Sequence, residues 1–466
     1  MSTTRTPDVA HEIRRFYPQL EGMRAIAAIG VLTTHVAFQT RAVGLPIIGP
    51  VLGRLDLAVA LFFGLSGFLL WRPWVGAAHG RVAKPSVRRY LAHRLIRIWP
   101  AYLVVVVVVL TLLPDAKNAD LTVWLANLTL TQVFVPLSLT AGLTQMWSLS
   151  VEVAFYALLP LIGYSMLRLR ARGVRDGRVL WRIPVLLGLG AVGLGWAWVA
   201  MALPVAAGVE PKNWVFGHLP WFVAGLVLAE LAGIVELDEH RPVPRWVRSV
   251  VAVGARRWLM LAVLVIAYAL ACTPLAGPTG LGDLAAWQFA VKMVLGAICG
   301  FAVLAPLVCS AGAGSHVGEP GVRGAELEAS GPGSDVGESG VRAVGSAVGE
   351  SGVRAVGSAV GESGAPTSFR FLTSRGMLAL GRWSYGIFIW HLAVLAAVFP
   401  LFGIVPFNGH FPLVWALTVG LTIGVSAASY AFVEEPARRW LRVRESRRRV
   451  AAASATTPEP APVLPS

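Results

Sequence analysis

Long apolar segments recur along the whole chain and alternate with short polar or charged stretches. A transmembrane helix needs about 20 mostly apolar residues, because the hydrocarbon core of a bilayer is about 30 Å thick. This pattern predicts an all-α polytopic membrane protein with about ten transmembrane helices. The ten candidate spans are 20–36, 55–71, 98–113, 151–167, 183–203, 214–231, 258–275, 289–309, 383–402 and 412–433.

One further apolar segment, Trp124–Pro136, is too short to cross a bilayer. Counting it as a span would reverse the side of every later loop and would contradict the distribution of charge described next. We therefore expect an interfacial or re-entrant piece on the outer side.

The basic residues alternate between the two sides of this arrangement. If the N-terminus is cytoplasmic, 34 of the 40 Lys and Arg residues fall in inner segments and four fall in outer loops. By the positive-inside rule, this split predicts that the N- and C-termini are both cytoplasmic. The net charge of +15 is then explained by topology and by contact with membrane lipid, so no nucleic-acid partner is expected.

A repetitive stretch interrupts the apolar pattern. The sequence VGESGVRAVGSA at 336–347 recurs at 348–359, with a partial third copy after it. A Gly-rich repeat without aromatic residues cannot bury a core, so we expect residues 311–368 to form a disordered cytoplasmic insert. Either a neutral repeat expansion or a partner-binding role would account for it.

The insert divides the predicted membrane domain in two. The domain comprises residues 16–310 and 369–440, with a cytoplasmic tail at 1–15 and a disordered tail at 441–466. The chain is therefore expected to be a multi-pass protein of the cell membrane.

The first span carries ionisable side chains, which are rare at membrane depth. Arg24 and His35 are eleven residues apart, or about three helical turns, so they share a face and lie about 16 Å apart in depth. Glu21 lies near the same face. Such residues usually mark a substrate or proton path, although a structural polar cluster would also explain them.

The segment before the fourth span places a second acidic residue on the outer side. Ser148, Glu152 and Tyr156 are spaced four apart and share one helix face. Counted from the predicted ends of the two spans, Glu152 and His35 reach a similar depth. A carboxylate beside the imidazole would orient it as a general base. The alternative is that Glu152 only complements the helix dipole.

Two further groups of residues are candidates for binding. Arg94 and Arg97 are three apart and could clamp a phosphate from the cytoplasmic side, although the positive-inside signal alone would also explain them. His391 is a candidate for lining the cavity, and His218 for contacting an acceptor.

Other chemistry finds little support in the sequence. No cluster of His, Cys or Asp has metal-ligand spacing, so no metal and no bound cofactor are expected. Ser66 stands between Gly64 and Gly67, and we attribute this small-residue group to close helix packing rather than to a nucleophile.

Six segments together resemble the successive motifs of the integral-membrane acyltransferase 3 family, and they occur in the family's order. The resemblance spans about 16–440 except the insert. The segments are PQLEGMRAIAAIGVLTTH (18–35), ALFFGLSGFLL (60–70), HRLIRIWPAY (93–102), MWSLSVEVAFY (146–156), LGRWSYGIFIWH (380–391) and VEEPARR (433–439).

The resemblance implies a ten-helix membrane enzyme. Such enzymes move an acyl group, commonly acetyl, from a cytoplasmic acyl-CoA co-substrate to a hydroxyl of a carbohydrate or glycosylated molecule. His35 matches the family's essential histidine, Arg94 and Arg97 match its Arg-x-x-Arg pair, and Glu152 matches the acid of its Trp-Ser-Leu-x-x-Glu motif.

The chain also departs from the family's pattern. Glu21-Gly22-Met23-Arg24 stands where Asp-Gly-Leu-Arg is common, which keeps the acid and the arginine. Only 32 residues follow Glu434, so we expect no esterase-like domain after the last motif and expect any extracytoplasmic partner to be a separate protein. The variants resemble actinomycete members, whose acceptors include cell-envelope glycolipids and macrolides.

These predictions combine into one mechanism. Arg94 and Arg97 hold the donor phosphates, the pantetheine arm runs past Arg24, and His35, oriented by Glu152, deprotonates an acceptor from the outer side. Transfer is either direct or through an acyl-enzyme. The alternative function is a proton-coupled secondary transporter or flippase that uses the same residues, but the two matching halves typical of such transporters are absent from the sequence.

Overall fold

The structure is a computed structural model that describes residues 17–170, 177–237, 243–280, 282–313 and 369–455. Within these ranges the chain forms helices and turns and no strand. The predicted tail at 1–15 and nearly all of the predicted insert at 311–368 lie outside the described residues. The principal helices are α1 (Pro18–Gln39), α2 (Ile48–Gly53), α3 (Ala58–Ala78), α4 (Val87–Leu112), α5 (Leu121–Leu128), α6 (Trp147–Met166), α7 (Arg182–Ala202), α8 (Val215–Leu237), α9 (Arg245–Ala255), α10 (Arg257–Ala271), α11 (Ala286–Ala313), α13 (Arg375–Leu401), α14 (Phe411–Ser429) and α15 (Glu435–Ala455).

The described residues contain eight helical stretches that are long and apolar enough to cross a membrane. A ninth is added if α9 and α10, which meet at an angle of 77°, form one broken span. The remaining predicted span, 20–36, forms α1, which has a sufficient length of 22 residues but carries Glu21, Arg24 and His35. Length and composition therefore support eight or nine spans, and α1, which packs against α3, α13 and α14, falls outside that count.

The apolar segment at 124–136 is too short to span, as predicted. Part of it forms α5, an eight-residue helix whose N-terminus is capped by Asp120. The Tyr102 hydroxyl of α4 donates a hydrogen bond to the carbonyl of Asn127 in α5. This contact attaches the connection between α4 and α6 to the side of the bundle.

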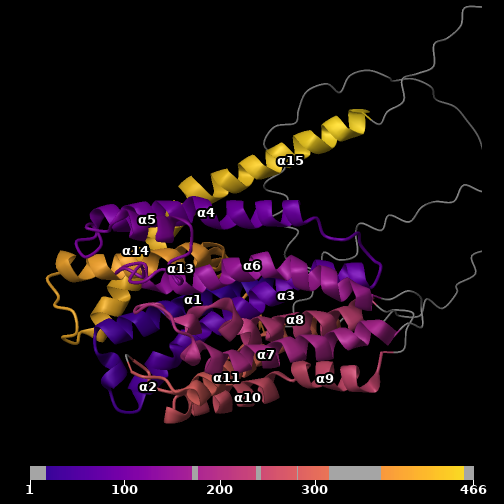
Figure 1. Cartoon of the computed structure of the whole chain (residues 1–466), viewed down its shortest axis with the longest axis horizontal. Coiled ribbons are helices and arrows are strands. Elements are labelled where there is room, and N and C mark those ends of the chain that lie inside the picture. The colour runs from indigo at the N-terminus through magenta and orange to yellow at the C-terminus, as the bar shows by residue number, and fades with distance from the viewer. Residues whose placement is uncertain (1–16, 171–176, 238–242, 281, 314–368, 456–466) are drawn as a thin grey trace, which may run out of the picture.

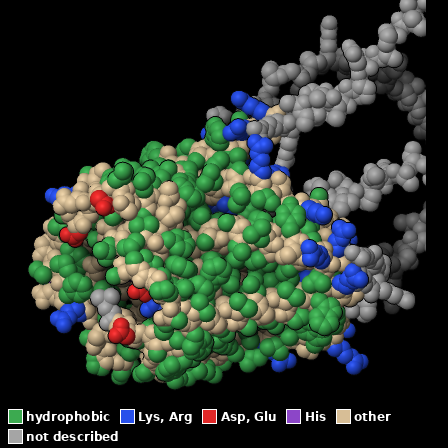
Figure 2. Space-filling model, viewed as in Figure 1, with side chains coloured by type: hydrophobic (Ala, Val, Ile, Leu, Met, Phe, Trp, Pro, Cys, Tyr) green, Lys and Arg blue, Asp and Glu red, His purple; other side chains and the backbone are tan. Residues whose placement is uncertain are grey.

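The exterior of the bundle is that of a membrane protein. The long helices run roughly parallel, with α2 and α5 at one end (Figure 1). Figure 2 shows a mostly apolar surface, with most of the visible Lys and Arg side chains gathered at one end and the acidic side chains, together with a few basic ones, at the other. The chain is a multi-pass membrane protein, and the basic end is the one we predict to be cytoplasmic.

Glycines bring the helices around the site unusually close together. A methyl group on Gly225 of α8 would collide with the Gly64 carbonyl of α3. A methyl group on Gly67 of α3 would collide with the Phe222 carbonyl of α8. The small-residue group around Ser66 therefore packs closely, as predicted. A methyl group on Gly381 of α13 would likewise collide with the Glu21 carbonyl of α1, so α1 and α13 pack closely.

The structure differs from the predicted disordered tail, 441–466, as far as Ala455, because the chain is helical up to that residue. Helix α14 continues through a π-helical turn, Tyr430–Glu434, into α15. Pro436 stands in the first turn of α15, where proline is tolerated, and Arg and Ala are strong helix formers. Glu445 of α15 accepts hydrogen bonds from Arg89 Nε and His93 Nε2 of α4, at 3.0 and 2.8 Å.

Candidate active site

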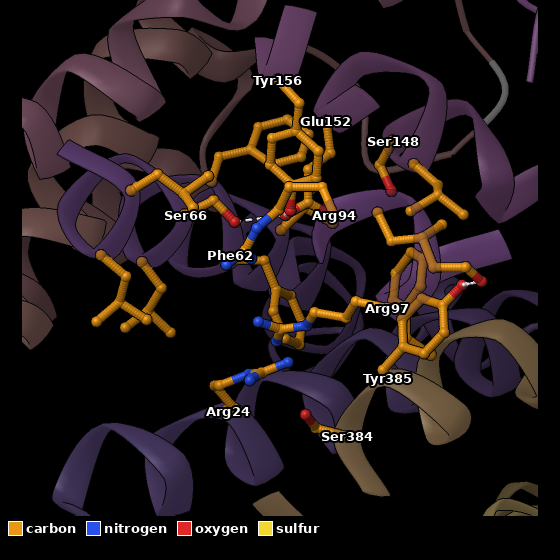
Figure 3. A pocket seen from close by; sticks show the side chains of 18 residues that line it. Arg24, Phe62, Ser66, Arg94, Arg97, Ser148, Glu152, Tyr156, Ser384 and Tyr385 are labelled. Carbon is orange, nitrogen blue, oxygen red and sulfur yellow. Dashed lines mark hydrogen bonds between the residues drawn. The ribbon is translucent and has the colours of Figure 1, made fainter. Parts of the chain in front are cut away.

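Five helices, α1, α3, α4, α6 and α13, enclose a chamber inside the bundle (Figure 3). Its volume of about 100 Å³ is somewhat smaller than that of cavities of about 150 Å³ that bind benzene. The chamber therefore suits a short acyl group or the end of an extended chain. Its polar lining consists of Arg24, Ser66, Arg94, Arg97, Ser148, Glu152, Tyr156, Ser384 and Tyr385.

Glu152 is the acidic residue of the chamber. Its Oε1 atom accepts a hydrogen bond from the Tyr156 hydroxyl, one turn along α6, at 2.6 Å. The same oxygen accepts a hydrogen bond from Ser66 of α3 (Figure 3). The predicted face of Ser148, Glu152 and Tyr156 therefore does point into one cavity.

Three arginines make the chamber electropositive. Arg24, Arg94 and Arg97 converge on it (Figure 3), against the single carboxylate of Glu152. Arg94 lies with its guanidinium 5.8 Å from the centre of the Tyr156 ring, and its buried Nε has no hydrogen-bond partner. An uncompensated positive charge in the protein interior is unfavourable, so the chamber favours an anionic or strongly dipolar group.

A wider cavity of about 660 Å³, which we call the mouth, adjoins the chamber. Arg24, Arg94 and Arg97 line both spaces and therefore stand where the two meet. Arg94 and Arg97 line the same two cavities, in agreement with the shared helix face that their spacing predicts. The other ionisable side chains of the mouth are Glu21, His93, Arg382, Tyr430, Arg438 and Arg442.

The charges of the mouth are only partly compensated. Arg438 is paired with Glu434 at 2.9 Å, Arg442 with Glu435 and His93 with Glu445, and Arg24 lies 3.8 Å from Glu21. Arg97 forms no hydrogen bond or ion pair with any described residue. The mouth therefore has the size and charge to hold phosphate groups.

His35 pairs with His391. His391 Nε2 lies 3.2 Å from His35 Nδ1, and the ring centres are 5.0 Å apart. Phe388 lines the chamber, and its ring centre is 5.9 Å from those of both His391 and Phe62. The histidine pair thus lies just beyond this phenylalanine wall.

The predicted pair between Glu152 and His35 is not formed, because the two residues lie at different depths. Gln145, before α6, already donates a hydrogen bond to the Ile389 carbonyl of α13 at 3.1 Å. Glu152 is seven residues, about 10 Å, farther toward the basic end. It therefore shares the depth of Arg24 rather than that of His35.

Asp56 lies close to this part of α1, because Thr34, the neighbour of His35, donates a hydrogen bond to the Gly53 carbonyl at 3.0 Å, three residues before Asp56. It precedes α3 and forms an ion pair of 2.6 Å with Lys292 of α11. Its Oδ1 atom is buried without a hydrogen-bond partner. Asp56, rather than Glu152, is therefore the acidic residue on the His35 side of the wall.

The remaining predicted residues are placed as follows. Ser148 donates a hydrogen bond to the Gln145 carbonyl at 3.2 Å and lines the chamber. His218 is buried, with its ring centre 5.0 Å from those of Trp147 and Trp221, and it lines neither the chamber nor the mouth. His391 does not line the chamber either.

Several residues of the site are not among the predicted ones. The sequence pattern assigns Ser66 to packing alone and does not single out Ser384, Tyr385 or Arg438, although all four lie in the motifs quoted above. Within the described residues, no group of His, Cys, Asp and Glu side chains could hold a metal ion.

Two named proteins are similar to this chain. Acyltransferase MdmB of Streptomyces mycarofaciens is 30% identical over 235 residues, which cover 46% of this chain and 56% of MdmB. Peptidoglycan O-acetyltransferase OatA of Listeria monocytogenes is 25% identical over 218 residues, which cover 44% of this chain and 32% of OatA. The chain thus spans about half of one relative and a third of the other. No solved structure matches the chain significantly.

A family model described as an acyltransferase domain matches residues 17–313, more than half of the chain. The match includes every chamber-lining residue except those of α13. The chain therefore belongs to the acyltransferase 3 family.

Proposed function

We propose that this protein is a membrane O-acyltransferase. It takes an acyl group, which we propose to be acetyl, from an acyl-CoA donor on the basic side of the membrane. It transfers that group to a hydroxyl of a glycan, glycolipid or macrolide-like acceptor. The observation that carries the proposal is the basic mouth, which narrows through Arg24, Arg94 and Arg97 into a chamber of acyl-group size.

The two cavities match the two parts of such a donor. The nucleotide carries phosphates, which suit the arginines of the mouth, since guanidinium groups bind phosphate through paired, charge-assisted hydrogen bonds. The thioester end is narrow and suits the chamber. There Ser66, Tyr156 and Glu152 form a hydrogen-bonded group that can hold its polar atoms.

Transfer requires the acyl end to pass Phe62 and Phe388 and reach His35. In the direct mechanism, His35 Nε2 takes the proton of the acceptor hydroxyl while the oxygen of that hydroxyl attacks the thioester carbonyl. The C–O bond of the ester forms, the C–S bond breaks, and the imidazolium returns the proton to the departing thiolate. His35 thus acts first as general base and then as general acid.

The acceptor is proposed to approach from the side opposite the mouth. Asp56 and Lys292 lie on that side of the phenylalanine wall and offer polar groups to an incoming hydroxyl compound. The name of the relative OatA, a peptidoglycan O-acetyltransferase, supports a carbohydrate acceptor. An extracytoplasmic partner protein that delivers or receives the acyl group is compatible with this arrangement.

The test uses inside-out membrane vesicles that contain the full-length protein. Acetyl-CoA labelled in the acetyl group is added, and label in the lipid and glycan fractions is measured together with released CoA. Label should appear with the wild type and be lost with His35→Ala. His410→Asn is the matched control, because His410 is an exposed histidine with a positive φ of 61°, which asparagine tolerates.

Two results would contradict the proposal. One is acetyl transfer by His35→Ala at the wild-type rate, with the protein present in equal amount. The other is movement of an unmodified substrate across the vesicle membrane without release of CoA, which would favour the transporter alternative.

A further inference from the structure

We propose that His391 is a positioning residue that fixes the tautomer of His35 and leaves Nε2 of His35 as the free base. This inference rests on the proposed function, in which His35 is the base. It assigns a role to a residue that belongs neither to the chamber nor to the mouth.

The surroundings of His391 determine which of its nitrogens carries hydrogen. The side chain is fully buried, and its Nδ1 lies 2.7 Å from the Phe388 carbonyl and 3.2 Å from the Ile387 carbonyl. A carbonyl oxygen can only accept a hydrogen bond, so Nδ1 must be the donor. In the neutral ring, Nε2 is then an acceptor, and it faces His35.

The same argument applies to His35. Its Nδ1 lies 2.8 Å from the Val31 carbonyl, one turn back in α1, and 3.2 Å from His391 Nε2. Both neighbours are acceptors, so the Nδ1 hydrogen is shared between them. Nε2 of His35 is then without hydrogen, and no described residue forms a hydrogen bond with it. His35 is partly exposed, which leaves this nitrogen accessible to a substrate.

This arrangement supports base catalysis in two ways. It excludes the tautomer with hydrogen on Nε2, which could not take a proton there. It also stabilises the protonated ring, because the Nδ1–H of an imidazolium donates more strongly to His391 than that of a neutral imidazole. A carboxylate has this orienting role in Ser-His-Asp triads, whereas here a neutral ring avoids burying a negative charge.

The close packing of α1 against α13 fixes the contact between His35 and His391. Gly381 of α13 lies against the Glu21 carbonyl of α1 near the basic end of these helices, and Gly22 of α1 lies against the Leu372 carbonyl in the turn before α13. His35 and His391 stand farther along the same pair of helices. The pairing is therefore a consequence of helix packing and does not rely on a loop.

The experiment compares His391→Phe with His391→Gln in the vesicle assay, with acetyl-CoA as donor. Phenylalanine fills the space but accepts no hydrogen bond, whereas the glutamine carbonyl can accept where Nε2 does. We expect His391→Phe to lower the maximal rate about 10- to 100-fold with the KM for acetyl-CoA unchanged. That loss is smaller than the about 10⁴-fold loss in triads with a wrong tautomer, because the Val31 carbonyl remains.

Two further readouts separate positioning from packing. His391→Gln should recover the rate to within about fivefold of wild type. In His391→Phe the acidic limb of the pH–rate profile should move to lower pH, because the His35 imidazolium has lost an acceptor. His410→Asn should match the wild type in rate and profile.

The outcomes distinguish the inference from the proposed function. If the wild type transfers no label, or His35→Ala keeps the rate, the proposed function is wrong. If His35→Ala is inactive but His391→Phe keeps the wild-type rate and pH profile, only the role of His391 is wrong. Equal losses in the Phe and Gln variants, with an unshifted pH profile, would make His391 a packing residue and would also overturn the inference.

Discussion

Replacing Arg97 by lysine tests how the mouth holds the donor. Arg97 lines both the mouth and the chamber and has no hydrogen-bond or ion-pair partner among the described residues. Its substitution therefore removes no hydrogen bond or ion pair within that part of the folded protein, and an effect on activity reports on the substrate. Lysine keeps the charge but loses the planar, two-point contact with phosphate.

The expected magnitude follows from the hydrogen bond that is lost. A hydrogen bond to a charged group contributes about 1.5–3 kcal/mol, and about 1.4 kcal/mol corresponds to a factor of ten. We expect Arg97→Lys to raise the KM for acetyl-CoA by about 10- to 100-fold. The maximal rate should stay within about twofold, because the phosphates are held equally in the ground state and the transition state.

The assay measures CoA-thiol release and acetyl transfer against donor concentration in membrane vesicles. Acetyl-pantetheine, which has no phosphate, serves as a second donor, and its KM should be the same for both proteins. Arg375→Lys is the matched control, because Arg375 is exposed at the start of α13 and lines neither cavity. An unchanged KM for acetyl-CoA, or equal changes for both donors, would refute phosphate binding by Arg97.

Three further variants test other parts of the account. Glu152→Gln should lower acetyl transfer at least tenfold, measured in vesicles at equal protein, because the charge facing three arginines is lost; full activity would remove Glu152 from the site. Gly225→Ala should lower the thermal unfolding midpoint of the purified protein, because overpacking costs about 1–3 kcal/mol. Gly420→Ala is the control and should leave the midpoint unchanged, because the space around Gly420 is open. Equal midpoints for the two variants would contradict the close packing of α3 against α8. Deleting 315–364 should leave transfer within about twofold, because shortening a loop changes its closure entropy by only about a kcal/mol; loss of the membrane-integrated protein would show a structural role for the repeat.

Local periodicity predicts the parts of the site that lie on a single helix. Arg94 and Arg97 share a face of α4, and Ser148, Glu152 and Tyr156 share a face of α6. Such relations depend only on the helical repeat, which the sequence carries directly. The family motifs add that both faces belong to one site.

The depth of a residue within the bundle cannot be predicted by counting residues from the expected end of its span. A fourth span that begins at 151 would place Glu152 near the depth of His35. The structure starts α6 at Trp147 and inserts Gln145 beside Ile389, which moves Glu152 toward the basic end. The connection between spans thus sets the depth, and no periodicity describes it.

Contacts between distant residues are also beyond the sequence. His35 and His391 are separated by 356 residues, and their pairing depends on the packing of α1 against α13. The glycine neighbours of Ser66 indicate helix packing, which the structure has. The sequence does not indicate the second role of Ser66, whose hydroxyl donates a hydrogen bond to Glu152. The tail after residue 440 differs from the prediction up to Ala455, where α15 continues from a first turn that contains Pro436.

The central claim is that the donor binds in the basic mouth and extends through the chamber toward His35. Photo-crosslinking tests it most directly, with an acyl-CoA that carries a photoreactive group on its acyl end and with peptide mapping by mass spectrometry. The account predicts adducts on α3 and α13 near Phe62 and Phe388, abolished by excess acetyl-CoA and weakened by Arg97→Lys. The claim would be contradicted if the adducts that excess acetyl-CoA prevents were confined to α2 and α5, at the opposite end of the bundle.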